Sequence, residues 1–99
     1  MSDIAQILVD FNDKVQNIFI SLYENFKVSA RKLDRTKDNN VFQQQEGKYL
    51  ATLKYQLDIL ALEILGKNKT LKNISQLNKK LTDAVNDYLN EFKQKSRSL

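Results

Sequence analysis

Carboxylates at a regular spacing are the first residues in this sequence whose types suggest chemistry. Asp83, Asp87 and Glu91 recur every four residues, so a helix would stack them on one face, between Lys79 and Lys95. Aligned carboxylates can hold a hard cation such as Ca²⁺. A face on which acidic and basic residues alternate is more typical of a solvated helix surface, so we predict no metal site here.

Nucleophilic and acid–base chemistry lacks its usual residues. The chain contains no histidine and no cysteine, which removes the commonest general base, the commonest metal ligand and the thiol nucleophile. Its serines have no imidazole to activate them, and no glycine-rich loop could cradle a phosphate. We therefore expect a protein that is not an enzyme and that has no catalytic, metal or cofactor site.

Positive charge is the more prominent signal, with a formal net charge of +4 and a pI near 9.3. The basic residues gather in three stretches, at 27–37, 67–72 and 93–97. Such clusters attract phosphate, an anionic lipid surface or an acidic protein, although they can also serve only to keep a small protein in solution. Nucleic acid ranks below a protein or membrane-surface contact, because acidic residues are mixed in and no aromatic platform interleaves the basic ones.

The candidate partner-contact residues come from two of these clusters and from three aromatic side chains. Most aromatic residues fall on apolar stripes and are expected in the core. The three exceptions are Tyr55, toward the edge of its helix, and Tyr88 and Phe92, near the chain end. The resulting set is Arg31, Lys32, Arg35, Lys37, Tyr55, Tyr88, Phe92, Lys93, Lys95 and Arg97.

The segment 49–65 is the element around which the chain is organised, since most of its residues are apolar and neither Gly nor Pro interrupts it. One apolar stripe runs along it at steps of three and four, and further apolar side chains cover much of the opposite side, as expected for a buried central helix. A membrane span is the competing interpretation. We reject it because the segment falls short of about 20 residues and carries Lys54, Asp58 and Glu63, each costly in hydrocarbon.

The first helix is marked by apolar residues at steps of four and three from Ile4 to Leu22, with Ser2 as a reasonable N-cap. After Phe26 the spacing weakens. A continuous helix over 3–35 would be roughly 50 Å long, against roughly 38 Å for 41–65, and a kink or a dimer would have to cover the unmatched end. Length therefore favours a break near 27–29, giving helices at 3–26 and 27–35, with one continuous helix as the alternative.

The rest of the chain is predicted to form a helical hairpin. A polar loop at 36–40 leads into a helix over 41–65, in which Gly47 marks a frayable entry or a close approach of another backbone. Gly66 is placed to end this helix as a left-handed C-cap, and a last helix follows over 71–95. The sequence thus predicts an antiparallel four-helix bundle, with three long helices and a second helix that is short or continuous with the first.

Composition agrees with one all-α domain over residues 1–99. The chain has no proline and only two glycines, so almost nothing breaks a helix. The absence of cysteine fits a reducing compartment, and no basic stretch followed by an apolar run marks a leader at the N-terminus. We expect a cytoplasmic protein.

In architecture and composition the chain resembles the bacteriocin immunity proteins of the pediocin-like, class IIa type from lactic acid bacteria and streptococci. The shared features are the length, the helical pattern, the basic charge, the lack of cysteine, the richness in Lys, Asn, Ile and Leu, and a C-terminal helical hairpin with a basic tail. The segments 3–26, 27–35, 41–65 and 71–95 can be laid onto the four-helix antiparallel bundle of that family, which has no catalytic signature.

The resemblance implies a cytoplasmic protein, peripheral at the inner face of the membrane, that protects a producing cell from its own bacteriocin. Its partner would be the bacteriocin's membrane receptor, a sugar permease of the phosphotransferase system, or the receptor in complex with the bacteriocin. Discrimination between bacteriocins would fall on the hairpin and on the tail with Lys93, Lys95 and Arg97. The tail is short and lacks aromatic residues after Phe92, which departs from the family. A homodimer is kept as an alternative assembly.

A second interpretation belongs to a different class, a small structural subunit of a coiled-coil assembly such as a tethering or kinetochore-type complex. The heptad-like seam from Ile4 to Leu22 and the loop rich in Asn and Gln favour it. The two interpretations differ in whether the chain folds cooperatively alone or needs its partners.

Overall fold

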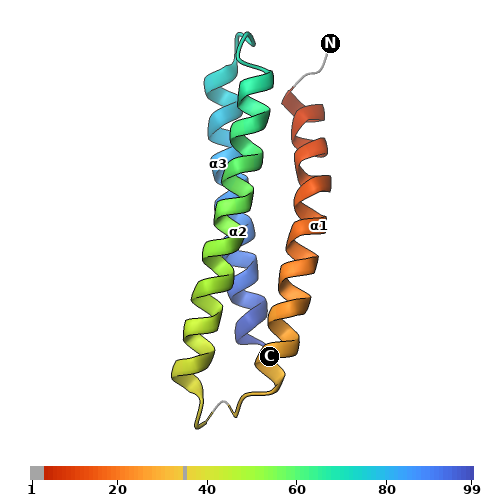
Figure 1. The fold of residues 1–99 in the computed structure, drawn as a ribbon. Coiled ribbons are helices and arrows are strands. Elements are labelled where there is room, and N and C mark those ends of the chain that lie inside the picture. Colours follow the sequence, from red (N-terminus) through yellow and green to blue (C-terminus); the bar gives the residue numbers. More distant parts are fainter. Residues whose placement is uncertain (1–3, 35) are drawn as a thin grey trace.

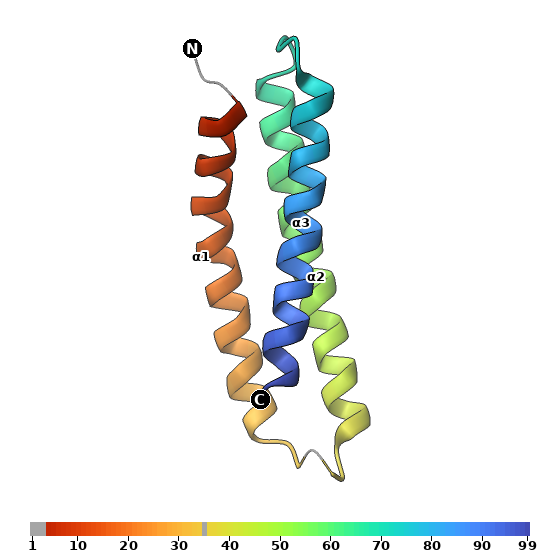
Figure 2. The ribbon, with the colours of Figure 1, turned by 180° about the vertical axis from the view of Figure 1, so that it is seen from behind.

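Three α-helices make up the protein in the computed structural model, which describes residues 4–34 and 36–99. They are α1 (Ile4–Arg31), α2 (Asn39–Lys67) and α3 (Ile74–Arg97). The chain runs along the rod three times, so α2 is antiparallel to α1 and α3 (Figures 1 and 2). The rod measures 53 × 18 × 17 Å. The all-α prediction is confirmed, since no strand occurs in the described ranges.

The predicted fourth helix is not found, because α1 continues through residues 27–29 without a break. Phe26 and Ala30 lie one turn apart and are both buried, so the buried face of α1 continues beyond Phe26, where the apolar spacing weakens. The length argument for a break was wrong as well. Helix α1 has 28 residues and α2 has 29, so neither leaves an unmatched end.

The left-handed glycine expected at the end of α2 is also wrong. Gly66 is helical, no described glycine has a positive φ, and α2 extends to Lys67. Asn68 ends the helix instead: its backbone N–H donates to the Leu65 carbonyl at 3.2 Å and its side-chain Nδ2 donates to the Ile64 carbonyl at 2.8 Å. Because the asparagine satisfies these carbonyls, no left-handed residue is required. At Gly47 an added Cβ would meet nothing within 4 Å, so no other backbone approaches.

The connection between α1 and α2 is held by its own acidic side chains. Asp38 occupies the N-cap position of α2, but its carboxylate accepts a hydrogen bond from the backbone N–H of Asp34 at 3.0 Å rather than from the helix. Asp34 in turn accepts from the backbone N–H of Thr36 at 2.9 Å. The proposed N-cap Ser2 lies outside the described residues.

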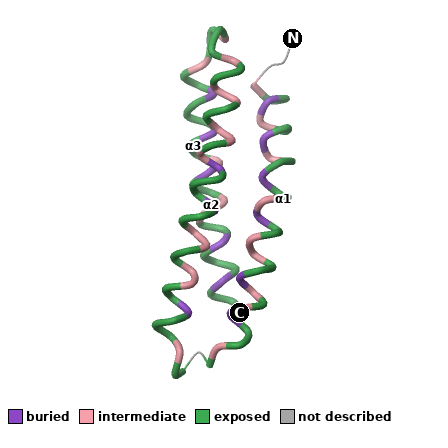
Figure 3. The backbone as a smooth tube through the Cα atoms, in the orientation of Figure 1, coloured by how far each residue is buried: buried purple, intermediate pink, exposed green. Residues whose placement is uncertain are grey.

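Helix α2 packs against both other helices, and each of the three helices carries buried residues, coloured purple in Figure 3. The core consists of Ile7, Phe11, Val15, Phe19, Phe26, Ala30, Phe42, Leu53, Leu57, Leu77, Leu81, Val85 and Phe92. The segment 49–65 is only partly covered, contrary to the prediction of a helix buried on most sides. Leu53 and Leu57 are fully buried, whereas Tyr55 and Leu62 are each 67% exposed. Within the described ranges, no helix is long and apolar enough to cross a membrane.

Candidate interaction surfaces

Two of the three basic clusters meet at one end of the rod. The end of α1, the loop into α2 and the last turns of α3 lie there together, whereas the cluster at 67–72 lies at the opposite end (Figures 1 and 2). We use the term basic end for the exposed side chains of Arg31, Lys32, Lys37, Lys93 and Arg97. All five are predicted contact residues. Arg35, also predicted, lies outside the described residues.

No cation of the basic end takes part in an ion pair with another described residue. The ion pairs in 4–34 and 36–99 join Lys27 to Glu24, Lys54 to Asp58 and Lys95 to Glu91. The carboxylates of the same end are bonded to neutral donors instead: Asp34 and Asp38 accept from backbone N–H groups, and Glu46 accepts from the Ser96 hydroxyl. The end therefore directs an excess of positive charge toward solvent.

Helix dipoles account for part of this placement. Helices α1 and α3 both have their C-termini at the basic end, and Arg31 and Arg97 stand in the last turns, where a cation offsets the negative end of a helix. Lys37 in the loop and Lys93 one turn earlier are not accounted for in this way. The cluster is larger than capping of the two helices requires.

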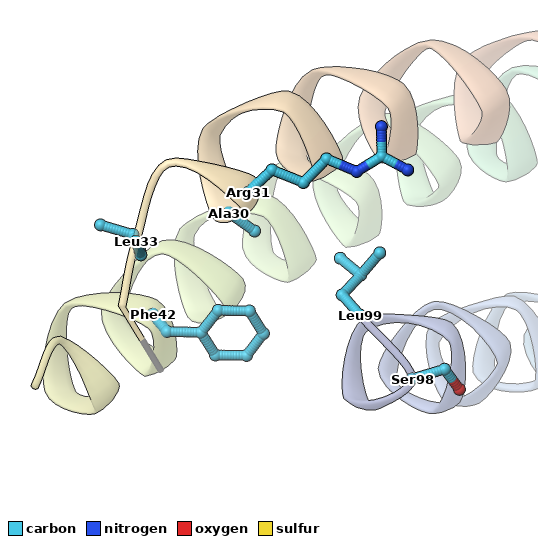
Figure 4. A pocket seen from close by; sticks show the side chains of 6 residues that line it. All are labelled: Ala30, Arg31, Leu33, Phe42, Ser98 and Leu99. Atoms are coloured by element: carbon cyan, nitrogen blue, oxygen red, sulfur yellow. The ribbon is translucent and has the colours of Figure 1, made fainter. Parts of the chain in front are cut away.

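A pocket of about 380 Å³ opens between the three segments of the basic end (Figure 4). Its apolar lining comes from Ala30, Leu33 and Phe42, and the phenyl ring of Phe42 points toward the gap between α2 and the end of α3. Arg31 lies on one side, and the last residues of the chain, Ser98 and Leu99, lie on another. The basic end thus combines cations with an apolar-lined pocket.

The last turns of α3 are bonded to α1 and α2 by polar side chains. The Ser96 hydroxyl is fully buried and carries a single proton, with the Glu46 carboxylate and the Lys93 carbonyl, 2.8 Å away, as its acceptors. Tyr23 donates its hydroxyl proton to the Lys95 carbonyl at 3.2 Å. Neighbouring side chains therefore position Lys93 and Arg97 on a rigid element.

Lys95 differs from the cations around it. Its Nζ lies 5.4 Å from the ring centroid of Phe19, 5.7 Å from that of Tyr23, and 3.8 Å from a Glu91 oxygen. These contacts hold the side chain against α1. Lys95 is a predicted contact residue, but its ammonium group already interacts with two aromatic rings and one carboxylate of the bundle.

A second surface runs along the outer side of α2. Tyr55, Ile59 and Leu62 follow one another at steps of four and three and are 67%, 39% and 67% exposed. We call these three residues the α2 strip. The Lys54–Asp58 ion pair, with a 2.6 Å separation, lies beside it. Of the strip residues, only Tyr55 is a predicted contact residue.

The remaining predicted contacts, Tyr88 and Phe92, face the interior. Phe92 is fully buried between the rings of Phe19, Tyr23 and Phe26, so it offers no surface to a partner. It was assigned to the surface because it lies near the chain end, but the long α1 extends far enough to cover it. Tyr88 is half-buried and donates its hydroxyl proton to Asn12 Oδ1 at 2.9 Å.

Partial burial of Tyr88 has an electrostatic consequence. Desolvation raises the pKa of its phenol above the ordinary value of 10.0, and the nearby carboxylates of Glu91 and Asp13 raise it further. A hydrogen bond with the Gln16 side chain opposes this rise in the pKa by favouring the ionised oxygen. Tyr88 therefore stays protonated and acts as a hydrogen-bond donor between α3 and α1.

The carboxylate series of α3 does not converge. Asp83, Asp87 and Glu91 are all exposed, and Glu91 is directed to Lys95. Among the residues that the structure describes, no group of three or more potential ligands lies close enough together to hold a metal ion.

Comparison with protein-family models, with curated proteins and with solved structures gives no match to this chain. The surfaces described above are therefore the basis for any functional proposal.

Sequence reasoning missed two features of these surfaces. Ile59 and Leu62 belong to the segment 49–65, which was predicted to be a buried helix, and the bond between Glu46 and Ser96 was not anticipated. The signal for the first was present: α2 carries apolar residues around most of its circumference, more than two neighbouring helices can cover. The second had no signal, because it joins residues 50 positions apart.

Proposed function

We propose that this protein is a non-catalytic binding module that packs the α2 strip against an amphipathic helix of a partner protein. The observation that carries the proposal is the exposure of Tyr55, Ile59 and Leu62 on one side of α2. Two other sides of the same helix already contact α1 and α3. An apolar third side is what a helix needs in order to accept one more helical neighbour.

The spacing and size of the strip favour a partner's helix over a second copy of this chain. Steps of four and three match the ridges of a packed helix, and the strip covers about 10 Å along α2. Its exposed area is roughly 350 Å², from the exposed fractions of the three side chains at about 200 Å² for each whole side chain. A stable complex uses about 800 Å² per partner, so the strip alone would hold a symmetric dimer only weakly. A partner helix gains further contacts on the polar border at Lys54, Asp58 and Glu63.

Site-specific photo-crosslinking in the native cell tests the proposal. A photoreactive phenylalanine analogue at position 55 or 62 should give one major crosslinked protein, whose crosslinked residues lie in an amphipathic helix. Positions 9 and 20 are the matched control, because Val9 and Ile20 are 51% and 55% exposed and belong to α1 rather than α2. Crosslinks to a second copy of the chain, or the same protein captured from 9 and 20, would refute a partner helix on α2.

The double variant Tyr55→Ser, Leu62→Ser should abolish the crosslinked complex while leaving the free energy of unfolding within about 0.5 kcal/mol per substitution, since both side chains are exposed. The double variant Val9→Ser, Ile20→Ser removes the same number of exposed apolar side chains. It should retain the complex, and its loss in both variants would argue for a general effect on the fold.

A narrower proposal comes from the resemblance to bacteriocin immunity proteins. In that case the partner is a sugar permease or its complex with a bacteriocin, met from the cytoplasmic side. The basic charge and the helical hairpin support it, whereas three helices in place of four depart from that family's bundle. Expression in a sensitive strain should then confer resistance to a cognate peptide. Unchanged killing by every bacteriocin encoded at a neighbouring locus would count against it.

The alternative is a structural subunit of a larger helical assembly. The α2 strip favours it specifically, because such subunits present apolar helix faces to partner helices. The crosslinked protein distinguishes the two: a membrane permease supports immunity, and a second small helical protein supports the assembly.

A further inference from the structure

We infer that the basic end is a docking surface for an anionic membrane, which it meets end-on with Arg31, Lys32, Lys37, Lys93 and Arg97. This inference concerns the end of the rod and does not depend on the α2 strip. It rests on three observations about the same place: cations that form no ion pair with any residue the structure describes, apolar side chains near them, and last turns of α3 that are bonded to α1 and α2.

Charge is the first observation. The five side chains come from three separate segments, and only the fold brings them to one end of a rod 18 × 17 Å in cross-section. They form no ion pair with the described residues, while the acidic groups of the same end accept hydrogen bonds from backbone N–H or hydroxyl donors. The complement of such a surface is a dense array of negative charges that can reach all five cations together.

Exposed apolar side chains near the cations distinguish a lipid surface from nucleic acid as the anionic partner. Val28, Val41 and Leu99 are 54%, 42% and 37% exposed, and the pocket lined by Leu33 and Phe42 opens among the cations. A lipid surface accepts cations at its headgroups and apolar side chains just below them. Nucleic acid offers phosphates but gives no favourable environment to exposed Val and Leu side chains, and the described residues of this end include no exposed aromatic ring on which a base could stack. The combination therefore favours a membrane.

The opposite end of the rod has a different charge pattern. Its pocket is also lined by apolar side chains, but Lys14 and Lys67 share it with the carboxylate of Asp10. Lys69 and Lys72 lie in the loop between α2 and α3. This end provides a matched control with the same residue type in an exposed loop.

Vesicle flotation tests the inference with the full-length protein. Vesicles of equimolar phosphatidylglycerol and phosphatidylcholine should bind it, vesicles of phosphatidylcholine alone should not, and added NaCl should release it, because exposed charges are screened. A basic side chain near an anionic leaflet strengthens binding about fivefold, so the double variant Lys93→Gln, Arg97→Gln should bind about 25-fold more weakly. The control Lys69→Gln, Lys72→Gln should bind like the wild type.

Both variants change exposed residues, and an unchanged helical circular dichroism spectrum and melting temperature will show that they fold. A separate arm measures binding to inorganic phosphate and to duplex DNA at the same ionic strength. Equal binding to neutral and anionic vesicles, tighter binding to DNA than to anionic vesicles, or an equal loss in the Lys69, Lys72 control would each overturn the inference. Weak binding to free phosphate alongside strong binding to vesicles is the expected result, since one phosphate cannot engage five separated cations.

Discussion

At the basic end of the rod, aromatic rings from all three helices meet, whereas toward the other end the helices touch mainly through aliphatic side chains. Phe26 of α1 has the rings of Phe42, Tyr49 and Phe92 at centroid distances of 5.5, 5.4 and 5.6 Å. Polar bonds reinforce the same half, where Tyr23 and Glu46 hold the last turns of α3. The strongest packing therefore lies directly beneath the exposed cations.

The other half has fewer restraints. Its buried side chains near the starts of α1 and α3 are Ile7, Phe11, Leu77 and Leu81. Among the described residues, none of the ring contacts involves Phe11. Local stability follows the density of buried contacts, so the first turns of α1 should open before its last turns.

The largest loss of stability in either half of the rod is expected from Phe26→Ala. Removal of a fully buried ring that touches three others should lower the free energy of unfolding by about 3–5 kcal/mol, a large part of the 5–15 kcal/mol typical of a small domain. Ile7→Ala in the other half should cost about 2 kcal/mol. Urea denaturation followed by circular dichroism measures both.

Because Phe26→Ala could unfold the chain, Phe26→Leu serves as the milder variant and should still cost more than Ile7→Val. An equal or greater loss at Ile7 would show that the aromatic half is not the more strongly held one.

A smaller effect is expected from Ser96→Ala. The substitution removes the hydroxyl that donates to the Glu46 carboxylate and should cost about 1–3 kcal/mol, because a partly buried acceptor is left without its donor. Ser98→Ala is the matched control two residues further on, where an exposed hydroxyl donates to the Gln94 carbonyl at 3.1 Å. Its expected change is within about 0.5 kcal/mol in thermal or urea unfolding. Equal effects at both positions would mean that Ser96 does not fasten α3 to α2.

The same comparison shows how far the sequence could predict the fold. The helical class and the buried apolar stripes could be predicted from local spacing, because a helix face repeats over a few residues. Leu53 and Leu57 are examples of such buried stripe residues. The number of helices could not be predicted, since it depended on whether the apolar face continued from Phe26 to Ala30. The residue that ends α2 was not predictable either. Asn68 replaced Gly66 in that role through a side-chain hydrogen bond that spacing cannot reveal.

The candidate surfaces were predictable only in part for a related reason. The sequence identified Arg31 and Lys93 as members of basic clusters, but their meeting at one end follows from the up-down-up path of the chain. Leu62 belongs to the segment 49–65, which was predicted to be buried, but two neighbouring helices cannot cover the whole circumference of α2 and Leu62 is exposed. Burial on a helix that is apolar around most of its circumference is a property of the assembly rather than of the segment.

The smallest effect concerns Tyr88, which links α1 to α3 near the middle of the rod. Its folded pKa is raised above the ordinary value of 10.0, so the folded protein keeps a proton that the unfolded chain loses. The corresponding stability is present below pH 10 and is lost as the pH rises through the folded pKa. Tyr88→Phe should cost less than about 1.5 kcal/mol at neutral pH through the lost bond to Asn12, and its stability should then fall less steeply above pH 10 than that of the wild type. Urea unfolding across this pH range measures the difference, and the exposed Tyr55→Phe is the control that should keep the wild-type stability at neutral pH. Parallel curves for Tyr88→Phe and the wild type would show that the link between α1 and α3 does not depend on this proton.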